Sequence, residues 1–203
     1  SNLIKNIKFY KLLINNIVLM NIHIEVTPNP SSLKFLPGKT VMEKETADFR
    51  NVEEAKFSPF ALNLFKIDGV EGVFFGSDFI SITKADNHDW QYLESTIIET
   101  IRECYKSETA FILAGQDSAG DTSATEDTEA VIQIKKIIDT QVRPAVARDG
   151  GDITFQSFDN GIVYLQMKGA CSGCPSSALT LKAGIEKTLK HYIPEVLEVQ
   201  QVT

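Results

Sequence analysis

The sequence is poor in three features, each of which would define a class of protein. Its 203 residues include three cysteines, too few for a disulfide scaffold that holds a small secreted domain together. No uninterrupted apolar run reaches the length of about 20 residues that a membrane span needs. Acidic residues outnumber basic ones by 27 to 20, and the net charge of −7 argues against a general nucleic-acid binder. We therefore expect neither a membrane nor a nucleic acid as a partner.

The composition is that of an ordinary globular chain. Hydrophobic residues make up 43% of it and charged residues 23%, which suffices for a sizeable core and argues against wholesale disorder. At about 150 residues per domain, the length fits one or two domains. We predict an α+β protein of two small α/β domains joined by a flexible acidic linker. The predicted divisions are a leader or upstream extension at 1–21, a first domain at 22–113, the linker at 114–128 and a second domain at 129–203.

The leader is apolar and carries Lys5, Lys8 and Lys11, but no acid and no arginine. A mitochondrial presequence would be rich in arginine, and a secretory signal would end in a small-residue cleavage pattern, which is missing here. Three interpretations stay open: an upstream extension before a start at Met20, an amphipathic helix, and a cleaved targeting segment.

Alternation and capping signals predict a first domain of strands and two helices. Ser58-Pro59 is typical of a helix N-cap followed by proline in the first turn, and Asp89 predicts the cap of a second helix. Alternating apolar residues predict the strands. The expected elements are strands at 22–26, 33–35, 70–75 and 79–83, and helices that begin at 59 and at 90.

The linker has no large apolar side chain from residue 115 to 128 and is acidic. Ordering it would cost backbone entropy with no burial in return. A linker of this length would let the two domains lie about 20 Å apart and reorient.

The second domain has the predicted order α-β-β-α-β. Its first helix contains Pro144, which should kink or split the helix because proline lacks an N–H group. Asn160-Gly161 is a strong hairpin turn signal between two apolar runs. The expected elements are a helix from 131, strands at 153–155 and 163–167, a helix from 178 to 192 and a strand at 196–202.

The chemistry of the sequence is concentrated in Cys171-Ser-Gly-Cys174, between a predicted strand and a predicted helix. Unpaired N–H groups and the positive dipole end at a helix start favour thiolates, so we expect both thiols to ionise readily. A thiolate binds metal or attacks a disulfide. We predict Cys171 and Cys174 as the functional pair, and Cys104 as a small core residue.

Three uses of this cysteine pair stay open on residue chemistry alone. A thiol–disulfide oxidoreductase also places such a pair at a helix start, although here the preceding residue is Ala170 and the preceding strands form a hairpin. A structural zinc site needs four ligands, and His23, His88 and His191 do not repeat at ligand spacing. An iron–sulfur cluster also needs four thiolates, which a symmetric dimer supplies most simply, two from each chain.

At these residues the sequence resembles a known family. Asp149-Gly-Gly-Asp152, the Asn160-Gly161 turn and Gly169-Ala-Cys-Ser-Gly-Cys-Pro-Ser-Ser177 resemble the C-terminal domain of the NifU-like (Nfu) iron–sulfur scaffold proteins, as does Ile193-Pro-Glu-Val196. The resemblance extends to the Nfu N-terminal domain through Thr27-Pro-Asn-Pro-Ser-Ser-Leu-Lys-Phe-Leu-Pro-Gly38, Ser58-Pro59 and Val73-Phe-Phe-Gly-Ser-Asp-Phe79. It covers about residues 22–203.

The resemblance implies a carrier, and no enzyme. Two chains would bind a [4Fe–4S] cluster, or alternatively [2Fe–2S], through Cys171 and Cys174 of each. They would receive it from upstream cluster assembly proteins and pass it to apo iron–sulfur proteins such as lipoate synthase and aconitase. The implied location is the cytoplasm in a bacterium or the mitochondrial matrix in a eukaryote. We expect the carboxylates of Asp149 and Asp152 to serve turn formation and not acid–base catalysis.

Overall fold

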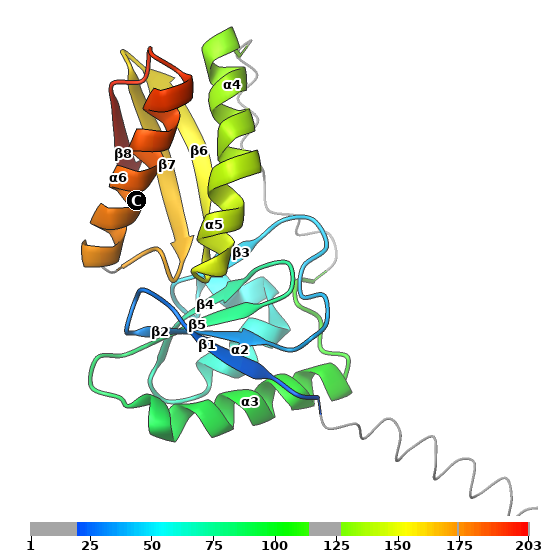
Figure 1. Ribbon diagram of the computed structural model, residues 1–203. Coiled ribbons are helices and arrows are strands. Elements are labelled where there is room, and N and C mark those ends of the chain that lie inside the picture. The colour runs from blue at the N-terminus through cyan, green and yellow to red at the C-terminus, as the bar shows by residue number, and fades with distance from the viewer. Residues whose placement is uncertain (1–19, 114–126, 174, 203) are drawn as a thin grey trace, which may run out of the picture.

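The computed structural model describes residues 20–113, 127–173 and 175–202, which form two α+β units (Figure 1). The predicted fold class is confirmed, including the order α-β-β-α-β in the second unit. The predicted leader and most of the predicted linker lie outside the described residues. Within the described part of the chain, no helix is long and apolar enough to cross a membrane.

The first unit is a five-stranded antiparallel sheet with helices on one face (Figure 1). The strand order is β1-β2-β5-β4-β3, so the hairpin of β4 and β5 lies inside the sheet. One face carries α2 and α3, and the opposite face is free of helices of this unit. The elements are β1 His23–Val26, β2 Ser32–Leu36, β3 Ala47–Phe49, η1 Glu54–Phe57, α2 Pro59–Phe65, β4 Val70–Phe75, β5 Ile80–Lys84 and α3 Trp90–Lys106.

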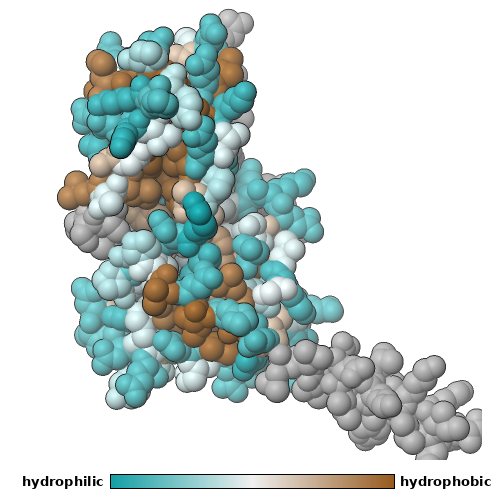
Figure 2. Space-filling view, viewed as in Figure 1, coloured by the Kyte–Doolittle hydropathy of each residue, from teal (hydrophilic) through white to brown (hydrophobic). Residues whose placement is uncertain are grey.

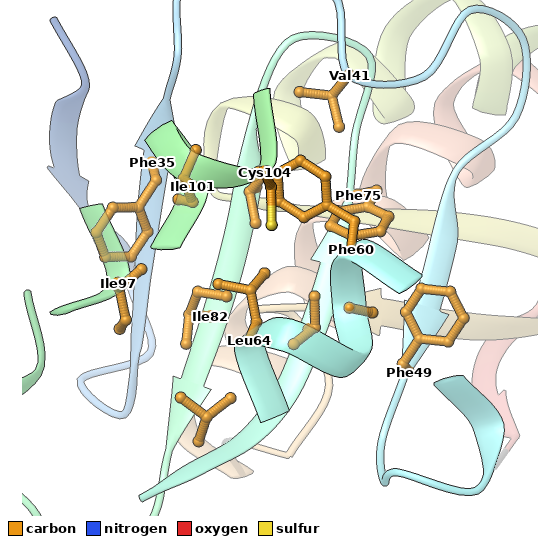
Figure 3. Packing of buried hydrophobic residues seen from close by; sticks show 14 of the residues in the cluster. Phe35, Val41, Phe49, Phe60, Leu64, Phe75, Ile82, Ile97, Ile101 and Cys104 are labelled. Atoms are coloured by element: carbon orange, nitrogen blue, oxygen red, sulfur yellow. The ribbon is translucent and has the colours of Figure 1, made fainter. Parts of the chain in front are cut away.

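The core of the first unit lies between the sheet and its two helices (Figure 3). Phe60 at its centre is fully buried, with its ring stacked on Phe111 at 4.3 Å between centroids and edge-on to Phe75 at 5.6 Å. The predicted cap of α2 is confirmed, since the Ser58 hydroxyl accepts a hydrogen bond from Ala61 N at 3.1 Å. Asp89 occupies the N-cap position of α3 but makes no side-chain cap hydrogen bond, so that part of the prediction was wrong.

The second unit packs two helical segments against a three-stranded sheet. β6 and β7 form the predicted antiparallel hairpin, and β8 pairs parallel with β7. The first helix is divided by a π-helical segment just before Pro144, because this residue donates no backbone hydrogen bond. The elements are α4 Glu129–Ile137, η2 Ile138–Val142, α5 Arg143–Arg148, β6 Gly151–Asp159, β7 Ile162–Gly169, α6 Pro175–Tyr192 and β8 Glu198–Val202.

The helix-free face of the first sheet lies against the end of the second unit (Figure 1). This end of the second unit consists of the turn from α5 to β6 and the loop from β7 to α6. In this structure the two units are in direct contact, closer than the about 20 Å that the linker length would allow. Side-chain hydrogen bonds join the two units directly, for example from Ser81 of β5 to Gly150 O at 2.6 Å.

Candidate functional site

The candidate site is the loop that connects β7 to α6. The strand ends at Gly169, which has a φ of 63°, and Ser172 turns back to donate from both its N and its Oγ to Gly169 O, at 3.0 and 2.9 Å. Gly173 has a φ of 88°. These left-handed positions suit glycine and turn the chain toward the start of α6 at Pro175. Cys174 lies outside the described residues, so only Cys171 of the predicted ligand pair is placed.

Cys171 is turned into the second unit, and only 6% of its surface is exposed. It belongs to the apolar core formed by residues such as Ile153, Met167 and Ile185. Gly151 leaves the room for it, since a Cβ at that position would lie 2.7 Å from the Cys171 Sγ. The side chain of residue 151 thus decides whether the thiol fits inward.

Burial, and to a smaller extent the charges of Asp149 and Asp152, raise the pKa of the Cys171 thiol to about 12. The expectation that this thiol ionises readily is therefore wrong for the conformation observed. Desolvation in the apolar core disfavours the charged form of the thiol. The raised pKa favours the neutral thiol in this position, whereas a metal ligand is a thiolate.

Asp152 anchors the turn beside the cysteine loop. Its carboxylate is 6% exposed and accepts two hydrogen bonds from Arg143, from Nε to Oδ1 and from Nη2 to Oδ2, both at 2.8 Å. Ile153 N donates to Oδ1 at 2.8 Å, and the hydroxyl of Thr46 in the first unit donates to Oδ2 at 2.8 Å. The carboxylate serves more than the turn that the sequence predicts, because it also ties α5 and the first unit to β6.

Side chains from the first sheet contact the main chain on both sides of Cys171. Asn29 Nδ2 donates to Ala170 O at 3.2 Å, and Gly169 N donates to Asp48 Oδ1 at 3.2 Å. Burial raises the pKa of Asp48, although the hydrogen bond from Gly169 and the charge of Arg50 act in the opposite direction. The first unit therefore forms part of the surroundings of the loop. Sequence reasoning missed this, because main-chain acceptors carry no sequence signal.

Cys104 lies far from this loop in the fold, inside the core of the first unit (Figure 3). It is 3% exposed on α3, beside Ile101, as predicted for a core residue. Among the residues that the structure describes, no group of three or more His, Cys, Asp and Glu side chains is placed to hold a metal ion. The loop is preceded by the antiparallel pair β6 and β7, which differs from the βαβ setting of thioredoxin-like pairs.

A groove of about 640 Å³ runs between α6 and the segments η2 and α5. Figure 2 shows apolar surface between these helices, and Val142, Leu181 and Ile185 line it. Pro28 of the first unit lies at its edge. The groove adds an apolar surface close to the domain junction.

Comparison with known proteins agrees with this architecture. The model of the NifU-like domain matches residues 134–200, and that of the scaffold protein Nfu/NifU N terminal matches residues 22–108. The mitochondrial NifU-like protein 4 of Arabidopsis thaliana is 50% identical over 90% of this chain and 66% of its own length. The human mitochondrial NFU1 iron-sulfur cluster scaffold homolog is 46% identical, over 90% of this chain and 72% of its own length.

Two domains of these kinds in one chain define the class of NifU-like and Nfu proteins. The chain belongs to the NFU1 and NifU-like family, and it spans about two thirds of the length of the first two relatives, 66% and 68%. A solution structure of a NifU-like protein from Saccharomyces cerevisiae is 24% identical, with a TM-score of 0.43 over 49% of this chain and 87% of its own.

Proposed function

We propose that this chain carries a [4Fe–4S] cluster between two copies of itself and transfers it to apo iron–sulfur proteins. The observation that carries the proposal is the cysteine pair of the β7–α6 loop, in a chain that belongs to a family of iron–sulfur scaffolds. Such a cluster takes four thiolates, and each chain supplies two in this pair. A second copy completes the set by symmetry.

A cluster held in halves suits delivery better than permanent redox service. The ligands belong to two chains, so separation of the chains exposes the cluster to an acceptor. Upstream cluster assembly proteins supply the cargo, and apo iron–sulfur proteins receive it without covalent turnover of a small substrate. Since the relatives named above are mitochondrial, we place the protein in the mitochondrial matrix if its source is a eukaryote, and in the cytoplasm if it is bacterial.

Each part of the loop has a task in this proposal. Cys171 and Cys174 bind iron as thiolates. Gly169 and Gly173, with φ of 63° and 88°, allow the loop a backbone path that other residues resist. Cys171 reaches the cargo by leaving its place beside Gly151. The start of α6 then favours the thiolate form once the thiol is exposed.

The test is anaerobic reconstitution of the full chain with iron and sulfide. We expect broad absorption near ~400 nm and about four irons for each pair of chains, as four thiolates require. Cys171→Ala and Cys174→Ala should each abolish the absorption, whereas the matched control Cys104→Ala should keep it, because Cys104 lies in the other core. Colourless wild-type protein that reduces insulin disulfides would instead identify a thiol–disulfide oxidoreductase.

A further inference from the structure

The contact between the two units is concentrated on the main chain around the cysteine loop. Most of these hydrogen bonds run from side chains of the first unit to main-chain carbonyls of the second unit, whereas Gly169 N donates in the opposite direction to Asp48. Lys34 Nζ lies 3.4 Å from Arg148 O and Ser81 Oγ lies 2.6 Å from Gly150 O. Arg50 Nη2 adds a contact to Met167 O at 3.4 Å. The first unit therefore holds both turns that frame the loop.

Two glycines let the surfaces come this close. A Cβ at Gly150 would lie 2.9 Å from Ser81 Oγ, and a Cβ at Gly169 would lie 2.8 Å from the Phe74 ring. Phe74 points to the helix-free face and is 1% exposed. The main chain at Gly150 and Gly169 is thus packed closely against the first sheet.

Beside the Phe74 ring, the first unit contributes buried polar side chains to this contact. Asn29, Lys34 and Ser81 are 4%, 7% and 2% exposed, and each has a hydrogen-bond acceptor across the junction. Polar groups of this kind regain water when two surfaces separate, so a polar junction opens at lower cost than an apolar one. The contact is specific in its geometry and suited to reversible docking.

We propose that the first domain is a reversible cap, which holds the cysteine loop with Cys171 turned inward and lifts when the loop meets a second copy. That the loop binds a cluster rests on the proposed function, whereas the cap is inferred from the contacts between the two units. With the cap closed, Asn29 and Asp48 bind the residues just before Cys171. With the cap lifted, the loop is free to present Cys171 to another chain.

The test compares the wild type with Asn29→Asp/Ser81→Ala in the full chain. Asp at position 29 keeps the oxygen that accepts from Ser31 N at 3.0 Å, but it removes the donor to Ala170 O. Alanine at position 81 removes the donor to Gly150 O. The control is Asn63→Asp/Ser107→Ala, the same chemical changes on the helical side of the first unit, where neither side chain contacts the second unit.

The primary readout is the alkylation rate of Cys171 in reduced, metal-free protein, followed by mass spectrometry of the labelled peptide. We expect the junction variant to react about 25-fold faster than the wild type, since each lost hydrogen bond shifts an equilibrium about fivefold. The control variant should react at the wild-type rate. Trp90 fluorescence during denaturation confirms that the first domain of each variant is folded.

A second readout, the initial rate of cluster formation from iron and sulfide, separates the two proposals. Faster alkylation together with faster cluster formation supports the cap. Unchanged alkylation in the junction variant overturns it, whatever the cluster does, and so does faster alkylation with an unchanged rate of cluster formation. If neither the wild type nor the junction variant forms a cluster, faster alkylation of the variant still supports the closed junction, and the absence of the cluster contradicts the proposed function instead.

Discussion

Replacement of Asp152 by alanine tests the most connected carboxylate of the second domain. The change removes an acceptor of four hydrogen bonds, each at 2.8 Å: two from Arg143, one from Ile153 N and one from the Thr46 hydroxyl. The carboxylate is 6% exposed, whereas the Arg143 side chain is 41% exposed. After the change, Arg143 therefore regains water, but the buried main-chain donor of Ile153 loses its acceptor.

The expected cost follows from these exposures. Breaking a fully buried ion pair costs about 3–5 kcal/mol, and the exposure of Arg143 reduces the cost here. We expect the free energy of unfolding of the second domain to fall by about 2–3 kcal/mol, mostly from the lost charge-assisted hydrogen bonds. For a domain of this size, the melting temperature should fall by about 10–20 °C.

Two probes separate the domains in the assay. Far-UV circular dichroism follows both, while the single tryptophan, Trp90, reports the first domain, where its Nε1 donates to Pro30 O at 3.1 Å. The matched control is Asp159→Ala, which removes an exposed carboxylate at the end of the same strand. Equal melting temperatures for the two variants would refute the assignment of Asp152 as an anchor.

Three further changes test other parts of the fold. Gly161→Ala should destabilise the second domain by more than about 1 kcal/mol in urea unfolding, because Gly161 has a φ of 82° and a Cβ there would lie 2.7 Å from Leu197. Equal stability of the variant and the wild type would contradict this turn geometry. Hydrogen bonds from Lys190 and Val199 N lower the pKa of Glu186 in the folded state. The ionised side chain therefore stabilises the fold above its unfolded-state pKa, and this stabilisation is lost as the pH falls through the lowered folded-state pKa. Glu186→Gln should flatten that acid limb of a stability–pH curve, and an unchanged limb would contradict it. Phe60→Ala should lower the stability of the first domain by about 3–5 kcal/mol, measured by Trp90 fluorescence, since it empties the centre of an aromatic cluster; a loss under about 1 kcal/mol would contradict that packing.

Local signals predicted most of the elements because their physics is local. Ser58-Pro59 begins a helix with its own side-chain cap, and Asn160-Gly161 turns a hairpin through φ of 48° and 82°. The strand Ala47–Phe49 was missed, since three residues are too few to show alternation. Its neighbour β4 supplies the pairing that defines it.

The surroundings of Cys171 were predicted less well, because they are made by contacts distant in the sequence. A helix start near a cysteine argues for a thiolate, yet burial against Gly151 and the charges of two carboxylates raise the pKa of this one. The acidic linker argued for separate domains, but Asn29 and Ser81 recognise main-chain carbonyls 141 and 69 residues away. Carbonyl acceptors are present at every residue, so no pattern in the sequence distinguishes these.

The cluster shared by two chains is tested most directly by native mass spectrometry of the reconstituted protein, with iron and sulfide determined on the same sample. We predict a species of two chains that holds about four irons and four sulfides, and apoprotein chains once the cargo has passed to an acceptor. Stoichiometric iron and sulfide on single chains, without added thiols, would contradict the account.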